Sequence, residues 1–447
     1  MIWRAQLPSL PDLPALQRRH PQRFPFLLES VAAHPQAGRW DLLLGDPEQH
    51  LRLRGGELRG SDGLVPAGDF FQSLDAWAAQ LPPLARDALP FCGGWFLYLG
   101  YEAARVVEPT LRLPDSPYPL PDALAVRCPS ALLIDRNTQQ AFAISERGES
   151  ALQALCALAQ QAPLPPQAHT IEAQLEEEPA QRYLDGVRAV LEYLRAGDVF
   201  QVNLSRRWDV RIAAQATPTE LYARLRRHNP APFAGLMLWE DAAVISSSPE
   251  RLLQLDGALI QTRPIAGTRR RGDSEEEDAR LRAVLRDNLK ERAEHIMLLD
   301  LQRNDLGRVC VPGSIEVSEL MNLESYAHVH HIVSNVRGRL RAGIGAGEAL
   351  RAVFPGGTIT GCPKVRVMQI IAELEREGRG PYTGAMGYLS RDGRLDTNIL
   401  IRSMVWQRGQ LSFRAGAGIV ADSQPQAELQ ETRAKARGLL LALDAGA

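Results

Sequence analysis

The amino-acid sequence predicts an α+β fold, in which antiparallel sheet is combined with helices. Two observations support this class. Short strand-like runs alternate with helical segments through the second half of the chain. Several runs are joined by hairpin-like turns, such as RDGR at 391–394 and QRGQ at 407–410, which are typical of antiparallel pairing. With 447 residues, 45% of them hydrophobic, the chain can bury a large core and is long enough for about two or three domains.

The first part of the chain, residues 1–162, is predicted to consist of short strands joined by turns. Proline-containing loops separate short apolar runs there, among them DLLLGD at 41–46 and ALLIDR at 131–136. The next segment, 163–178, is first rich in proline and then acidic, and we interpret it as a linker. Residues 179–447 are then expected to form a second, larger domain.

A helix opens this second domain. Pro179 suits its first turn, Gly197 suits its end, and one face carries the apolar residues Leu184, Val187, Leu191 and Leu194. Further helical segments are expected at 274–301, 363–377 and 426–443. Strand-like pieces lie between the helices, at 199–208, 242–248, 257–265, 327–338, 385–390, 399–406 and 411–421.

Composition points to an ordinary globular protein. The formal net charge of −2 gives no indication of a nucleic-acid or membrane-surface partner. No apolar stretch approaches the roughly 18 residues of a membrane span, and the first residues lack the apolar core of a signal peptide, so we expect a cytoplasmic protein. The five cysteines are scattered without a C-x-x-C motif, which favours reduced, mostly buried thiols.

Two acidic pairs of the same form lie far apart in the chain. Glu291 and Glu294 make one pair, Glu428 and Glu431 the other, and a spacing of three residues places both carboxylates of a pair on one helix face. Each pair alone is most simply a solvated helix face. If the two helices meet, four carboxylates converge, and an all-oxygen cluster of this kind suits Mg²⁺. The pattern therefore predicts a magnesium enzyme that acts on an anionic small molecule.

Other motifs are weaker. Gly416, Gly418 and Ala421 match the G-x-G-x-x-A dinucleotide fingerprint, but too few residues follow for the unit that the fingerprint needs. These small residues let backbone N–H groups approach an anion such as a carboxylate. In a strand, His328 and His330 face one side and His331 the other, so a shared metal is not expected and His331 is either a core residue or a catalytic one.

Ten segments resemble, in order, the sequence blocks of the chorismate-utilising enzymes, which include anthranilate synthase component I, aminodeoxychorismate synthase component I, isochorismate synthase and salicylate synthase. These segments are GDVFQVNLSRR, SPERLL, TRPIAGTRRRG, AEHIMLLDLQRNDLGRVC, HHIVSNVRG, FPGGTITGCPKVR, GPYTGAMGYLS, ILIRS, AGAGIVADS and ETRAKA. The resemblance extends from residue 180 to the end, and more faintly into the first part. It implies a layered sandwich of two large, mainly antiparallel sheets flanked by helices, as in anthranilate synthase component I.

The resemblance implies the binding residues for magnesium and substrate. Glu294 and Glu431 correspond to direct Mg²⁺ ligands, and Glu291 and Glu428 to residues that act through water. The metal would hold the ring carboxylate of chorismate. The residues implied for substrate binding are Tyr382, Arg402, Gly416, Gly418, Lys435, Gly267 and Thr360, of which Arg402 and Tyr382, with backbone N–H groups near the two glycines of 416–418, take the enolpyruvyl carboxylate.

The resemblance also implies the catalytic residues. Glu250 corresponds to the general acid that protonates the departing C4 hydroxyl, which requires a carboxyl kept neutral near pH 7. Thr268 and His331 correspond to polar residues around the substrate. Gln201 stands where members that add water to chorismate carry a lysine base, so we predict ammonia as the nucleophile. None of the cysteines has a neighbourhood that favours a glutaminase site, and a separate glutaminase subunit is therefore implied.

Two amination products are open to such an enzyme. Ala266 in PIAGT agrees with the anthranilate synthases, because enzymes that make 4-amino-4-deoxychorismate commonly carry lysine there. Thr360 in TITG and the compact first part favour the aminodeoxychorismate branch. On balance we predict Mg²⁺-dependent formation of 4-amino-4-deoxychorismate, for 4-aminobenzoate and folate synthesis. The alternatives are anthranilate formation for tryptophan synthesis and a non-catalytic chorismate-binding paralogue.

A last resemblance concerns regulation. Leu28, Glu29 and Ser30 in LLES resemble the tryptophan-binding element of the family, which serves feedback inhibition in one branch. The simpler interpretation is a buried hairpin. Tryptophan is thus a further predicted ligand, and the sequence leaves open whether it regulates this protein.

Overall fold

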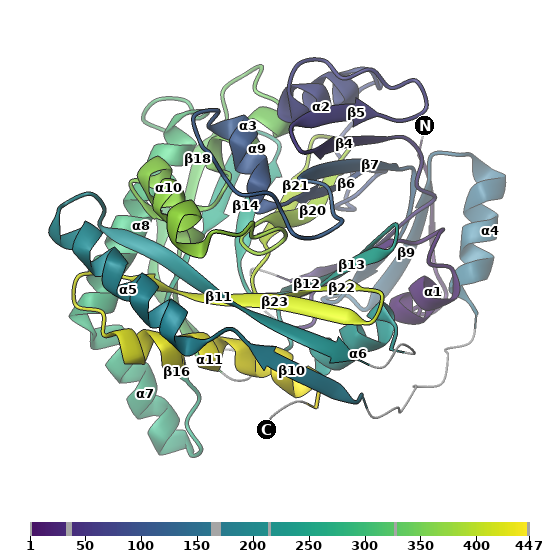
Figure 1. Ribbon diagram of the computed structural model, residues 1–447. Coiled ribbons are helices and arrows are strands. Elements are labelled where there is room, and N and C mark those ends of the chain that lie inside the picture. Colours follow the sequence, from purple (N-terminus) through teal and green to yellow (C-terminus); the bar gives the residue numbers. More distant parts are fainter. Residues whose placement is uncertain (1, 33–37, 162–170, 213–215, 326–328, 445–447) are drawn as a thin grey trace.

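The computed structural model describes residues 2–32, 38–161, 171–212, 216–325 and 329–444. Within these residues, the strands form two large sheets, and helices cover their outer faces (Figure 1). Neighbouring strands pair antiparallel in both sheets. The predicted α+β sandwich is confirmed.

The first sheet contains twelve of the described strands. Its spatial order is β1 (Trp3–Gln6), β9 (Gln140–Ser145), β8 (Ser130–Asp135), β3 (Trp40–Gly45), β2 (Phe26–Glu29), β12 (Phe233–Trp239), β13 (Ala242–Ser248), β22 (Ser403–Gln407), β23 (Gln410–Ile419), β11 (Gln201–Ile212) and β10 (Ala173–Glu177), with β19 (Gly361–Cys362) paired to β11.

The second sheet contains eleven. Its order is β16 (Ile265–Arg270), β18 (Val329–Arg339), β15 (Leu259–Arg263), β14 (Arg251–Asp256), β21 (Leu395–Ile399), β20 (Ala385–Ser390), β6 (Gly94–Leu99), β7 (Ala123–Cys128), β4 (His50–Arg54) and β5 (Glu57–Gly60), with β17 (Glu316–Ser325) paired to β18.

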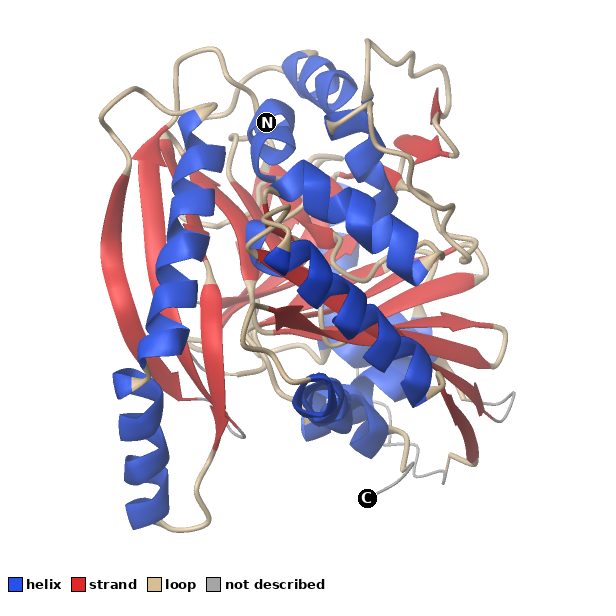
Figure 2. Cartoon of the chain, turned by 60° about the vertical axis from the view of Figure 1, so that its left-hand side comes forward, coloured by secondary structure: helices blue, strands red, loops and turns tan. Residues whose placement is uncertain are grey.

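The helices lie mainly outside the sheets (Figure 2). They are α1 (Leu13–Arg19), α2 (Phe70–Ala79), α3 (Ala104–Val107), α4 (Glu149–Ala159), α5 (Ala180–Arg195), α6 (Pro218–His228), α7 (Glu275–Asp287), α8 (Leu289–Gly307), α9 (Ala346–Val353), α10 (Lys364–Glu375) and α11 (Pro425–Ala442), with 3-10 turns at Tyr101–Ala103 and Gly357–Ile359.

Strands from both parts of the sequence share both sheets. In the first sheet β2 pairs with β12, and in the second β6 pairs with β20. Phe26 of β2 stacks on Phe96 of β6, with ring centroids 3.9 Å apart, so the inner faces of the two sheets pack on each other. Residues 1–162 are therefore built into the same two sheets as residues 179–447.

The predicted linker needs a correction. Residues 163–170 of the segment 163–178 lie outside the described residues, but Ala173–Glu177 form β10 on the edge of the first sheet. Acidic residues suit this edge because Glu177 bonds the guanidinium groups of Arg206 and Arg433. The acidic composition that suggested a linker instead matches basic partners on β11 and α11.

Helix α5 confirms the helix expected after Pro179. Pro179 is the N-cap residue, and Gly197 follows the helix with φ of +79°. The most buried positions are Tyr183, Val187 and Val190, so the apolar stripe is centred slightly to one side of the predicted one. These side chains share an apolar core with β11.

Two expected elements are each divided. Segment 274–301 forms α7 and α8 rather than one helix, because Asn288 leaves the helical conformation and its side-chain oxygen accepts the N–H of Glu291. Segment 399–406 is interrupted before β22, and Arg402 there has φ of +53°. The strands on either side of this interruption belong to different sheets.

Candidate active site at the crossing between the sheets

The candidate site begins where the chain passes from one sheet to the other. Glu250 lies between β13 of the first sheet and β14 of the second, and Arg402 lies between β21 of the second and β22 of the first. The two crossings lie side by side, because the carbonyl of Glu250 accepts the N–H of Ile399 at 2.9 Å and that of Arg402 accepts the N–H of Ser247 at 3.1 Å. A carboxyl and a guanidinium are thus held near the seam of the sandwich.

Glu250 has the environment of a neutral acid. It is 4% exposed, and its Oε1 accepts the hydroxyl of Thr358 at 2.8 Å and the N–H of Ile265 at 3.5 Å. Burial raises the pKa of this carboxyl from 4.5 to about 7, although both hydrogen bonds and the charge of Lys435 act in the opposite direction. The carboxyl can therefore carry a proton near neutral pH.

His331 lies on the adjoining strand pair β16 and β18. Its ring is buried, and burial lowers its pKa to about 4, with further lowering by the charge of Arg402. It also hydrogen-bonds the backbone of Gly267, which lies at a bulge with φ of +66°. A neutral imidazole near Arg402 agrees with the predicted role of His331 as a polar residue around the substrate. Thr268 pairs with His331 in the strand register, but its side chain lies outside the described residues.

Glycines in β23 allow polar groups to approach the backbone closely. A Cβ atom on Gly416 would lie 2.7 Å from the hydroxyl oxygen of Tyr382 and 2.8 Å from Oδ1 of Asn203. On Gly418 it would lie 2.4 Å from Nε2 of Gln201. Any side chain at these positions would clash. The structure thus brings Gln201, Tyr382 and both predicted glycines together.

Two cations reach this region. Lys435 bonds Glu431 at 2.7 Å and the carbonyl of Gly416 at 3.0 Å, so it ties α11 to β23. The guanidinium of Arg402 forms no salt bridge with the described residues, and burial lowers its pKa while Tyr382 and Glu431 raise it. It is available for an anionic ligand.

One residue of each acidic pair, Glu291 on α8 and Glu431 on α11, lies near the same basic residue, Arg269. Arg269 bonds Glu291 at 3.0 Å, and its charge also lowers the pKa of Glu431, after the larger effect of Lys435. Glu294 follows Glu291 one turn along α8. On α11, Glu428 and Glu431 both lie close enough to Tyr183 to raise its pKa.

The carboxylates are not gathered around a single point. Within the described ranges, no three His, Cys, Asp or Glu side chains are grouped so that they could hold a metal ion. Glu291 and Glu431 are paired with Arg269 and Lys435 instead. Their chemistry fits a hard divalent cation, since all four predicted ligands are carboxylates.

Thr360 does not point its hydroxyl into the site. The hydroxyl donates to the carbonyl of Gly356 at 2.9 Å within its own turn. Its carbonyl accepts the N–H of Asn203 at 2.8 Å. Thr360 therefore supports β11 through its backbone, and its predicted part in substrate binding stays a prediction.

The predicted tryptophan element lies elsewhere, in the first sheet. Leu28 and Glu29 are in β2. Glu29 is buried, its carboxylate accepts the hydroxyl of Tyr222 at 2.6 Å and pairs with Arg226 at 3.0 Å, and burial raises its pKa to about 7. The N–H of Ser30 donates to Asp41 at 2.7 Å. This is a separate buried polar cluster, and tryptophan binding stays a prediction.

Sequence reasoning missed several residues of the site. Asn203 could have been found, since it follows Gln201 by two residues and so lies on the same strand face. Thr358 lies in the glycine-rich block FPGGTITGCPKVR, of which only Thr360 was predicted as a site residue. Arg379, which is buried, donates to the carbonyl of Asn203 at 2.7 Å and pairs with Glu375 at 2.6 Å. The four-residue spacing could have suggested the ion pair, but not the contact with β11.

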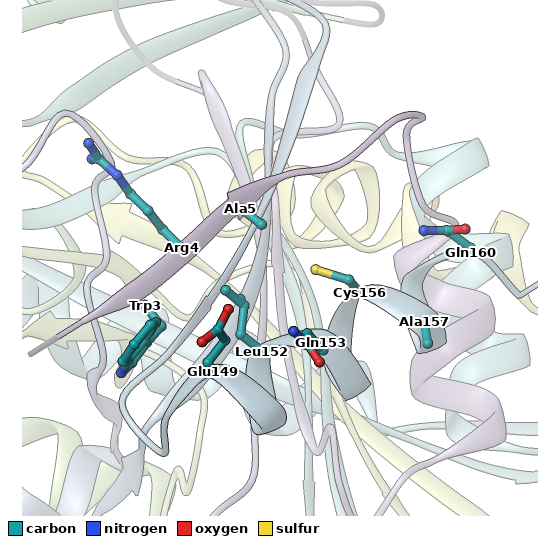
Figure 3. Close-up of a pocket in the computed structure, with 9 residues that line it drawn as sticks. All are labelled: Trp3, Arg4, Ala5, Glu149, Leu152, Gln153, Cys156, Ala157 and Gln160. Atoms are coloured by element: carbon teal, nitrogen blue, oxygen red, sulfur yellow. The ribbon is translucent and has the colours of Figure 1, made fainter.

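A hollow on the outer edge of the first sheet contains none of the predicted site residues. Figure 3 shows it between β1 and α4, lined by Trp3, Arg4, Ala5, Glu149, Leu152, Gln153, Cys156, Ala157 and Gln160.

All five cysteines are free thiols, as expected. Of the helices formed by the described residues, none combines the length and apolarity needed to span a membrane.

Comparison with known proteins gives a consistent family. A family model described as chorismate binding enzyme matches residues 26–441. Anthranilate synthase component 1 of Synechocystis sp. is 41% identical, with 95% of this chain and 91% of that protein aligned. The protein of the same name from Pseudomonas aeruginosa is 39% identical, with 94% and 90% aligned.

Solved structures agree with the sequence relatives. The crystal structure of anthranilate synthase component I from Streptococcus pneumoniae superposes with a TM-score of 0.80 at 31% identity, covering 91% of this chain and 93% of that one. The isochorismate synthase MenF from Escherichia coli has a TM-score of 0.76 at 18% identity, covering 99% and 94%, and supports the fold alone.

Proposed function

Because the chain belongs to the family of chorismate-binding enzymes, we propose that it converts chorismate and ammonia into anthranilate, pyruvate and water. The observation that carries this proposal is the agreement of relatives named anthranilate synthase component 1, which are 38–41% identical over nearly the whole chain. This replaces our expectation of 4-amino-4-deoxychorismate as the product; the findings favour the alternative.

The residue at position 266 supports the same choice. The aminodeoxychorismate route expected from the sequence commonly uses a lysine there, and this chain has Ala266 in β16. Of the two lysines whose side chains are described, Lys364 pairs with Asp305 and Lys435 with Glu431. Thr360, which favoured the other branch, uses its hydroxyl inside its own turn.

The proposed chemistry needs a proton donor for a poor leaving group. The amino group of anthranilate is ortho to the carboxylate, so ammonia bonds to ring C2 while the C4 hydroxyl leaves as water. Glu250, with its raised pKa, supplies the proton that the hydroxyl takes as it leaves. The bond from C3 to the enolpyruvyl oxygen then breaks, the proton lost from C2 is balanced by one gained at the enolpyruvyl methylene carbon to give pyruvate, and the ring becomes aromatic.

Substrate charge is divided between two regions of the site. Arg402 and the hydroxyl of Tyr382 take the enolpyruvyl carboxylate. We assign Glu291, Glu294, Glu428 and Glu431 to a Mg²⁺ ion, which when bound would hold the ring carboxylate and neutralise its charge. Lys435 and Arg269, which now pair with two of these carboxylates, keep the excess negative charge small before the ion binds.

Ammonia is expected to come from a partner. The family resemblance and the names of the relatives, each called a component, support a separate glutaminase subunit. Burial raises the pKa of Cys92 and of Cys128 to about 12, so neither is activated for glutamine hydrolysis.

The test is product identification. Purified protein is incubated with chorismate, Mg²⁺ and an ammonium salt at alkaline pH, without any partner, and the products are identified by mass and fluorescence. Anthranilate with an equal amount of pyruvate is expected. Accumulation of 4-amino-4-deoxychorismate without pyruvate would contradict the proposal and restore the other branch.

A further inference from the structure

Two carboxamide oxygens on one face of β11 are buried without a partner. Gln201 is 6% exposed and Asn203 8% exposed, and neither Oε1 of Gln201 nor Oδ1 of Asn203 has a hydrogen-bond partner among the described residues. Being two residues apart in a strand, both side chains project to the same side. Buried acceptors are nearly always hydrogen-bonded in folded proteins, so a neighbouring pair without partners indicates a ligand with donors.

The backbone N–H and carbonyl of Asn203 both form hydrogen bonds, whereas its side-chain oxygen lacks a partner among the described residues. Its N–H donates to the carbonyl of Thr360 at 2.8 Å, and its own carbonyl accepts Arg379 at 2.7 Å. Arg379 is itself held by the buried carboxylate of Glu375 at 2.6 Å. The strand is therefore fixed, and the Asn203 carboxamide is presented from a rigid support.

The carboxamides adjoin the groups that we assign to substrate. Oδ1 of Asn203 and the hydroxyl of Tyr382 both lie beside Gly416, and Nε2 of Gln201 lies beside Gly418. Arg402, which forms no salt bridge with the described residues, and the hydroxyl of Tyr382 are donors and suit a carboxylate, whereas a pair of neutral acceptors suits N–H groups. Among the reactants, ammonia is the one that carries several N–H donors.

We propose that Asn203 and Gln201 together bind the incoming ammonia, with their carboxamide oxygens accepting its N–H groups next to the chorismate carboxylate. Asn203 is thereby a binding residue for the nucleophile. This inference rests on the proposed amination of chorismate. It does not depend on which carbon receives the nitrogen.

Two substitutions at one position separate ammonia binding from substrate binding. Asn203→Val removes the acceptor, whereas Asn203→Asp keeps acceptors and removes the N–H donors. Rates are measured with ammonium chloride as the only nitrogen source, with chorismate and ammonium varied in turn at saturating Mg²⁺. Asn203→Val should raise the KM for ammonia about tenfold and leave the KM for chorismate within about twofold, while Asn203→Asp should keep the KM for ammonia.

The contrary outcomes are distinct. If Asn203→Val raises the KM for chorismate and leaves that for ammonia unchanged, Asn203 donates to the substrate carboxylate and the inference is wrong. Unchanged constants in Asn203→Val would also reject it. Should Asn203→Val fail to fold by thermal unfolding, Gln201→Leu gives the same comparison. A wild-type protein that makes 4-amino-4-deoxychorismate overturns the proposed product but not the ammonia site, whereas no amination at all overturns both.

Discussion

At the scale of single residues, the site depends on charges placed where water is scarce. Burial lowers the pKa of His331 to about 4 and raises that of Tyr382 to about 12, so both are uncharged near neutral pH. Burial also raises the pKa of Glu250 to about 7, so a large fraction of this carboxyl is still protonated there. Arg402 remains the cation that an anionic substrate can meet. The site is thus prepared for a negatively charged ligand and for donation of a proton.

Replacing Glu250 with Gln should lower kcat by about 10²- to 10⁴-fold with little change in the KM for chorismate. The reason is that Gln keeps the shape of the side chain but has no acidic proton. In the wild type, kcat should fall as pH rises through about 7, since the carboxyl is protonated below its raised pKa and ionised above it. Steady-state rates between pH 6 and 9 check both statements, and near-normal turnover by the variant would exclude Glu250 as the acid.

Replacing Glu431 with Gln should raise the Mg²⁺ concentration for half-maximal activity by about tenfold or more, because one negative oxygen ligand is lost. Glu276→Gln, at an exposed carboxylate of α7, is the matched control and should leave it unchanged. The measurement is a magnesium titration of initial rates. An equal response in both variants would remove Glu431 from the metal site.

At the scale of elements, the crossings between the sheets place Glu250 and Arg402, and these crossings were not predictable from sequence periodicity. Segment 399–406 reads as one apolar strand, and only the left-handed conformation of Arg402 and the pairing of its neighbours divide it between two sheets. Strand β10 was not predictable either, because its acidic residue Glu177 pairs with Arg206 and Arg433, which lie far away in the sequence. In both cases the conformation depends on contacts between residues that are distant in the sequence.

Helical elements followed local pattern much more closely. The ends of α5 agree with Pro179 and Gly197, α10 lies within its expected segment, and α11 begins one residue before its own. Asn288 interrupts the longest expected helix through its own side chain, which is a local signal that hydrophobic spacing does not report. The four acidic residues were chosen from spacing alone, and their arrangement on α8 and α11 depends on Arg269 and Lys435.

The packing of α5 on β11 gives a test at this scale. Val187→Ala should lower the free energy of unfolding by about 2 kcal/mol, because it removes buried methyl groups from the core shared with β11. Val284→Ala on α7, where the valine is 45% exposed, should change it by less than about 0.5 kcal/mol. Denaturant unfolding of both variants makes the comparison, and equal effects would contradict the described packing.

At the scale of the whole molecule, residues 1–162 help to hold the site in place, although the predicted site residues for substrate, metal and catalysis all lie after residue 179. Glu102, just after β6, accepts backbone N–H groups of Arg379 at 2.7 Å and Gly380 at 3.1 Å. Arg379 in turn holds Asn203 and Glu375. A carboxyl from residues 1–162 therefore fixes the segment that leads to Tyr382.

This carboxyl also predicts a pH dependence of stability. Burial raises the pKa of Glu102 from 4.5 to about 7, so its protonated form stabilises the fold fully below about 4.5, and this contribution is lost as pH rises through about 7. The change amounts to roughly 3 kcal/mol. The wild-type Tm should therefore fall between pH 5 and 8, and Glu102→Gln should reduce this fall. Calorimetry measures the Tm of the wild type and of the variant between pH 5 and 8. If Tm depends on pH in the same way in both proteins, the pKa of Glu102 is not raised by folding.

A crystal structure with Mg²⁺ and a chorismate analogue bound would test the central claim most directly. We predict that Glu294 and Glu431 coordinate the ion, that Lys435 or Arg269 gives up its present partner, and that the analogue's carboxylates contact the ion and Arg402. An analogue bound away from Glu250 and Arg402, with the acidic pairs of α8 and α11 still held only by their basic partners, would contradict the account.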